Sequence, residues 1–181
     1  MPLPETVYAS FSGPIDQQSI SRIFQNLAGA TQGGVRVVHV LFQSTGGSIN
    51  DGVALYNYLR TYSLELHFYN TGAVQSIAAV AWLGVAHRHV SQHGRFMLHH
   101  SSNPGLPGGN AAKYQAIVDS LVADDARTTA IVKTHTHIPD ERWALHATQD
   151  LSFNAQEAVD FDIAHDIREF EVPAGNQIFN I

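Results

Sequence analysis

The first half of the chain is a series of three strand patterns, each followed by a helix pattern. Strands are expected at residues 7–11, 35–42 and 64–69 because these runs are apolar or alternate. Helices are expected from Asp16, after the glycine turn at 44–47, and near Ser76. Strand–helix units in series predict an α/β fold with a mainly parallel sheet.

The second half breaks this regular alternation. Short strands are expected at 88–90 and 95–98, and residues 103–110, rich in glycine and proline, are typical of a loop. A long helix is expected from 111 to about 133, with shorter helices opening at 139–141 and at 155–159. No linker or low-complexity segment interrupts the chain, so we expect one domain, 1–181.

Composition excludes several classes of function. The 181 residues carry a net charge of −6 without a lysine–arginine cluster, which disfavours nucleic acid and anionic membranes as partners. The absence of cysteine excludes disulfides, thiolate zinc sites and a cysteine nucleophile. No signal-peptide pattern is present and the apolar stretch 77–86 is too short to span a bilayer, so we expect a cytoplasmic protein. A charged fraction of only 14% favours an oligomer.

Ser76 follows a strand and a glycine turn and begins a helix that is apolar nearly all round, which is typical of a buried helix. The bend from strand to helix can present the Ser76 hydroxyl to a cleft. Free backbone N–H groups and the positive end of the helix would then favour an oxyanion beside it. The alternative is a simple N-cap. Similarly, Gly46 and Gly47 let a backbone N–H approach a ligand closely, or form only a tight turn.

Histidine is abundant, with 11 in the chain, so a surface position is the simplest interpretation of any one of them. His99 ends an expected strand and is well placed for acid–base chemistry, and His100 would point to the other face. His87, His89 and His93 lie close together in sequence, but their spacing matches no zinc pattern.

The acidic member of a catalytic set is not determined by its local pattern. Asp150 lies just before the helix expected at 155–159, and three other aspartates nearby are rivals: Asp160, Asp162 and Asp166. The residues alone leave this choice open.

Four segments together resemble the proteolytic subunit of the Clp protease (the ClpP family). Residues 43–52 are similar to the family's N-S-P-G-G-x-x-x-x-G, and residues 72–78 to G-x-A-A-S-M-G/A, which contains its nucleophile. Residues 95–100 resemble R-x-M-I-H-Q, and residues 150–158 resemble D-R-F-M-S-A-x-E-A. The match runs in order over residues 7–167, and the family's catalytic positions fall on Ser76, His99 and Asp150.

The resemblance implies a ClpP/crotonase-like spiral of repeated β-β-α units with a protruding long helix. It implies a serine endopeptidase in which Ser76 attacks the peptide carbonyl, His99 moves the proton and Asp150 orients the imidazole. The backbone N–H groups of Gly47 and Ile77 would form the oxyanion hole, and cleavage would need no metal or cofactor.

The same resemblance implies partners. Family members form two stacked heptameric rings, docked through the long helix, and cleave peptides or unfolded proteins inside the closed chamber. Only about half a dozen residues precede the first expected strand, where the family has an N-terminal arm that helps receive a ring ATPase. An ATPase partner is therefore implied less directly than the peptidase. Two alternatives remain: a catalytically silent ring subunit, and a crotonase-type enzyme acting on acyl-CoA.

Overall fold

A computed structural model describes residues 4–103 and 108–181, so residues 104–107 of the expected loop lie outside the described part. The first half forms the three expected units: β1 (Thr6–Ser12), α1 (Gln17–Gln32), β2 (Val37–Ser44), α2 (Ile49–Thr61), β3 (Glu65–Gln75) and α3 (Ile77–Trp82). Asp16 caps α1 as expected, because its Oδ1 accepts the backbone N–H of Ser19 at 2.8 Å. The α/β fold class is confirmed.

The second half adds short strands and three helices. In chain order these are β4 (His87–Val90), β5 (Arg95–Leu98), α4 (Ala111–His135), α5 (Asp140–His146), β6 (Leu151–Phe153), α6 (Ala155–Asp160), β7 (Asp166–Ile167) and β8 (Ile178–Asn180). The sequence did not predict β6, a three-residue strand that pairs antiparallel with β5. All other pairings among the described strands are parallel.

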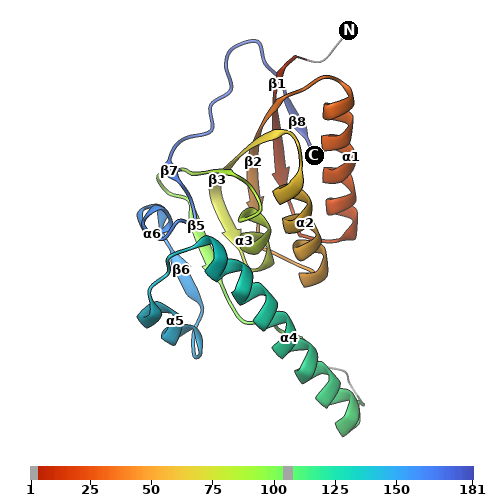
Figure 1. The fold of residues 1–181 in the computed structure, drawn as a ribbon, viewed down its shortest axis with the longest axis vertical. Coiled ribbons are helices and arrows are strands. Elements are labelled where there is room, and N and C mark those ends of the chain that lie inside the picture. The colour runs from red at the N-terminus through yellow and green to blue at the C-terminus, as the bar shows by residue number, and fades with distance from the viewer. Residues whose placement is uncertain (1–3, 104–107) are drawn as a thin grey trace.

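One sheet runs in the order β6-β5-β3-β2-β1-β8, and β4 lies between β3 and β7. The long strand β3 serves two neighbours, because residues His67–Asn70 pair with β4 and residues Ala73–Gln75 pair with β5. The helices α1, α2 and α3 lie beside one another against the sheet (Figure 1). Alternate residues of β1 and β2 are buried in the core, among them Phe11 and Phe42.

The end predicted for the strand at 64–69 was wrong, because β3 continues through the expected glycine turn to Gln75. Polar and glycine residues are tolerated inside this strand because their hydrogen bonds are satisfied. The Asn70 amide donates to Arg95 O at 2.9 Å, and its Oδ1 accepts Gly72 N at 3.1 Å. Because β3 continues to Gln75 and pairs there with β5, Ser76 lies next to the end of β5.

The long helix α4 extends away from the sheet at its N-terminal end (Figure 1), which confirms the protruding helix. Val132 is the one buried residue among its described positions. Tyr114, Val118 and Val122 follow one another at four-residue spacing and are 45%, 51% and 64% exposed. Across the described residues, no helix combines the length and apolarity that crossing a membrane requires.

Candidate active site

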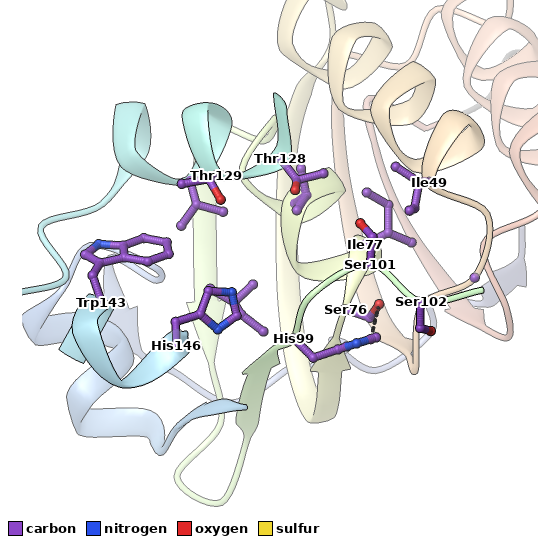
Figure 2. A pocket seen from close by; sticks show the side chains of 14 residues that line it. Ile49, Ser76, Ile77, His99, Ser101, Ser102, Thr128, Thr129, Trp143 and His146 are labelled. Carbon is purple, nitrogen blue, oxygen red and sulfur yellow. Dashed lines mark hydrogen bonds between the residues drawn. The ribbon is translucent and has the colours of Figure 1, made fainter. Parts of the chain in front are cut away.

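Ser76 stands at the bend between β3 and α3 in a rarely occupied backbone conformation, with φ 56° and ψ −135°. Its backbone N–H donates to Met97 O at 2.8 Å, which fastens the bend to β5. Its side chain makes no capping bond to α3, so the N-cap alternative is wrong. The hydroxyl instead hydrogen-bonds His99 Nε2, with Oγ and Nε2 2.7 Å apart (Figure 2).

Two glycines make room for this bend. A Cβ on Gly46, which has φ 100°, would lie 2.6 Å from Ser76 Cβ. A Cβ on Gly47, with φ 155°, would lie 2.2 Å from Ile15 O. Both positions therefore exclude larger residues: Gly46 approaches Ser76 closely, and Gly47 approaches the backbone of Ile15.

His99 reaches Ser76 because their strands are neighbours. β5 pairs with the end of β3 through Gln75 and Met97, so the residues that follow each strand emerge at the same edge. A histidine nitrogen within 2.7 Å of a serine hydroxyl can accept its proton. This pair has the geometry of a nucleophile and its base.

Asp150 lies next to His99 by strand register but is not bonded to it. β5 and β6 pair through Leu98 and Leu151, and one residue beyond this pair stand His99 and Asp150. Asp150 is exposed, and among the described residues no hydrogen bond joins its carboxylate to His99. The serine and the histidine are thus brought together, while strand register sets the aspartate beside the histidine with no hydrogen bond between them among the described residues.

The three rival aspartates have partners elsewhere. Asp160 accepts from the Gln156 amide at 2.8 Å, Asp162 bonds His137, and Asp166 bonds His89 Nδ1 at 2.5 Å. None of these contacts involves His99.

A fifth carboxylate, not singled out from the sequence, lies near the site. Asp125 on α4 bonds His100 Nδ1 at 2.8 Å and accepts Ser101 N at 2.7 Å. Burial tends to raise the pKa of Asp125, but the hydrogen bonds from Ser101 and His100 lower it overall. His100 therefore has its own carboxylate, and its second ring nitrogen bonds His146 O at 2.9 Å.

The proposed oxyanion groups lie in the same cleft as the serine and the histidine. Gly47 and Ile77 both line this cleft. Ile77 is the first residue of α3, so its N–H has no acceptor within the helix. The N–H groups of the bend and of a helix start can therefore serve a negatively charged oxygen next to Ser76.

The cleft, about 80 Å³ in volume, extends from Ser76 to the helices α4 and α5. Figure 2 shows Trp143 and His146 across the cleft from Ser76, with Thr128 and Thr129 on α4. Sequence patterns missed all four residues. Burial lowers the pKa of His146, aided by the nearby His100, so the neutral imidazole is favoured in the cleft wall.

The chain is similar to known proteolytic subunits. A family model described as Clp protease matches residues 4–171. Proteolytic subunit 4 of the ATP-dependent Clp protease of Rhodococcus jostii is 28% identical over 129 residues, covering 70% of this chain and 66% of the relative. Proteolytic subunit 2 of Corynebacterium glutamicum is 27% identical over 144 residues, covering 78% and 71%.

The chain spans about two thirds of the length of these curated relatives. The family model itself extends over nearly all of the described residues, from the first strand through β7. The bend at Ser76, the strand end at His99 and the protruding α4 all lie inside the matched range, and the chain belongs to the Clp protease family.

Proposed function

We propose that this protein is a serine endopeptidase in which Ser76 is the nucleophile and His99 the general base. The observation that carries the proposal is the 2.7 Å hydrogen bond between Ser76 Oγ and His99 Nε2 at a strained backbone bend. The hydroxyl is held by the histidine rather than by the helix it precedes. Attack on a peptide carbonyl would pass the hydroxyl proton to His99, which later returns it to the leaving amine.

Backbone N–H groups of Gly47 and Ile77 would stabilise the oxyanion of the tetrahedral intermediate, and their place in the cleft beside Ser76 supports this role. Asp150 would orient His99 by accepting from Nδ1. Its position one residue beyond the Leu98–Leu151 pair supports the assignment. Catalytic hydrogen bonds are often long in free enzymes, so we propose that the Asp150 contact forms when substrate binds or subunits assemble.

The substrates would be peptides or unfolded proteins admitted to a chamber between stacked rings of this chain. Membership of the Clp protease family supports a ring-forming assembly, and the relatives are named as proteolytic subunits. The exposed apolar residues of α4 supply a surface for docking between rings. A closed chamber would limit cleavage to chains that can be threaded or diffuse in.

Labelling with a fluorophosphonate, read by intact mass, tests the nucleophile. We expect one adduct on the wild type and none on Ser76→Ala. Ser102→Ala is the matched control, because Ser102 lines the same cleft and makes no hydrogen bond to His99 among the described residues. This control should label as the wild type does.

Absence of an adduct on a folded, assembled wild type would contradict the proposal. It would favour the silent ring subunit or the acyl-CoA enzyme. An adduct retained on Ser76→Ala would remove Ser76 from the mechanism.

A further inference from the structure

Four aromatic rings form a row on the face of the sheet opposite the core. Tyr8, His39, His67 and His87 are direct partners in the register of β1, β2, β3 and β4. Successive rings stack with centroids 5.1, 4.7 and 4.3 Å apart. Neighbouring parallel strands thus bring together histidines that lie 20 or more residues apart in the chain.

At one end of this row, three side chains direct ligand atoms toward a common point. One atom each from Glu65, His67 and His87 lies within 4.8 Å of the other two. Glu65 and His67 share a face of β3 because they are two residues apart, and His87 is the partner of His67 on β4. Glu65 is exposed, so an ion has a route from solvent.

Hydrogen bonds behind His67 indicate which of its nitrogens carries a proton. Asp166 is held by Arg168 at 2.6 Å and can only accept, so His89 Nδ1 donates to it across 2.5 Å. Neutral His89 then accepts at Nε2, and its partner at 3.1 Å is His67 Nδ1. His67 Nδ1 is therefore the donor of this pair.

The nitrogen of His67 that remains for a metal ion is Nε2. It lies 2.8 Å from Glu65 Oε1, so the imidazole and the carboxylate already face each other. In the pair as it stands Nε2–H can donate to the carboxylate, and a bound cation would replace that proton.

We propose that Glu65, His67 and His87 form a Zn²⁺ site outside the active site. Two imidazoles and one carboxylate are a ligand set that zinc favours, with a fourth position left for water. The chain from His67 through His89 to Asp166 is the outer-shell support that orients a metal-bound histidine. Zinc–ligand distances of about 2.0–2.2 Å place ligand atoms roughly 3.4 Å apart. Glu65 Oε1 and His67 Nε2, which lie 2.8 Å apart, would separate slightly to admit the ion, and the His87 atom, within 4.8 Å of both, would need only a small adjustment.

The site is separate from the proposed chemistry. Eight residues of strand separate His67 from Ser76, and the nine steps at roughly 3.3 Å each give a separation on the order of 30 Å. An ion here would cross-link β3 to β4 rather than act on substrate. Its role would be to stabilise the sheet.

Calorimetric titration of the EDTA-treated protein, residues 1–181, with ZnCl₂ tests the site. The titration is run at pH 7.5, because free histidine is mostly neutral at this pH. We expect one equivalent per chain and a rise in melting temperature. His67→Gln and His87→Gln should each weaken zinc binding by at least roughly tenfold. This is the smallest effect typical of losing an outer-shell hydrogen-bond partner, and loss of a direct ligand should cost no less. Circular dichroism and metal-free melting temperature would check that both variants are folded.

Two control variants separate this site from other histidines. His93→Gln removes an exposed histidine close in sequence to His87, and His99→Gln removes the imidazole bonded to Ser76. Both should bind zinc as the wild type does. No saturable binding, or binding that His67→Gln and His87→Gln leave unchanged, would overturn the proposal.

Discussion

The backbone of Ser76 is strained, because this non-glycine residue has a positive φ of 56°. Positive φ in a non-glycine residue of this kind costs on the order of 1–3 kcal/mol and persists only where the surroundings hold it. Here the hydrogen bond from Ser76 N to Met97 O holds the bend, and Gly46 leaves room for it because it carries no Cβ. The bend directs the hydroxyl to His99 rather than to α3, and the hydrogen bond to His99 Nε2 offsets part of the strain.

Asp150→Asn tests the third member of the proposed triad. The amide can no longer hold the imidazole in the tautomer that accepts from Ser76, so kcat should fall by roughly 10³–10⁴-fold. Peptide hydrolysis by assembled protein is the measurement.

Asp125→Asn is the matched comparison, because Asp125 is the carboxylate bonded to His100 next along the chain. The amide oxygen can still accept Ser101 N, so a much smaller loss is expected. A larger loss in Asp125→Asn than in Asp150→Asn would reverse the assignment.

At the scale of elements, β3 lies inside the sheet with strands on both sides, whereas α4 is mostly exposed. β3 pairs with β2 on one side, through residues 65–70 and 74, and on the other side with β4 through residues 67–70 and with β5 through residues 73–75. α4 buries one described residue, and its apolar residues at 114, 118 and 122 face solvent. We therefore expect this exposed apolar line to be a surface for association rather than part of the protomer's core.

Val118→Asp combined with Val122→Asp should dissociate the proposed stacked rings into smaller species. Each charge enters a contact that desolvates it, while in the single protomer both side chains are already exposed. Sedimentation velocity would measure the shift, and an unchanged far-ultraviolet spectrum would show that the helix persists.

Ser120→Asp is the control for this pair of substitutions. It adds the same charge to an exposed position about 200° around the helix from Val118. It should leave the assembly intact. Equal dissociation in the control would point to a general charge effect instead of a docking face.

At the scale of the whole molecule, several histidines are kept neutral by the fold. Burial lowers the pKa of His135, and the charges of Arg88 and Arg60 lower it further. Burial also lowers the pKa of His146 and of His165. Below the unfolded pKa of about 6.5, the unfolded chain binds protons that the folded protein does not, so acid weakens the fold.

The melting temperature, measured in EDTA, should therefore fall as pH is lowered from 7.5 toward 5.5. His135→Gln should reduce this fall, because glutamine does not titrate yet can still accept from Tyr56 OH, which lies 2.7 Å from His135 Nε2. His93→Gln, at an exposed position, should show the wild-type slope. A wild-type melting temperature that is flat or rises on acidification would contradict the linkage.

Local pattern in the sequence determined most of the elements and the fold class. The helix beginning after Asp16, the strand at 95–98 and the long helix from residue 111 all follow from side-chain period and capping. Ser76 and His99 were singled out by motif order, and the structure brings them within 2.7 Å. The assignment of Asp150 still rests on resemblance and register.

Tertiary structure alone decided which distant residues meet. The continuation of β3 through Gly72 depends on the bonds of Asn70 to its neighbours, and the cleft wall at Trp143 and His146 depends on where α5 packs. The sequence grouped His87 with His89 and His93, whereas parallel pairing sets His87 beside His67 and Glu65. Side-chain period is a local property, but strand pairing joins residues far apart in the chain, so no local pattern specifies it.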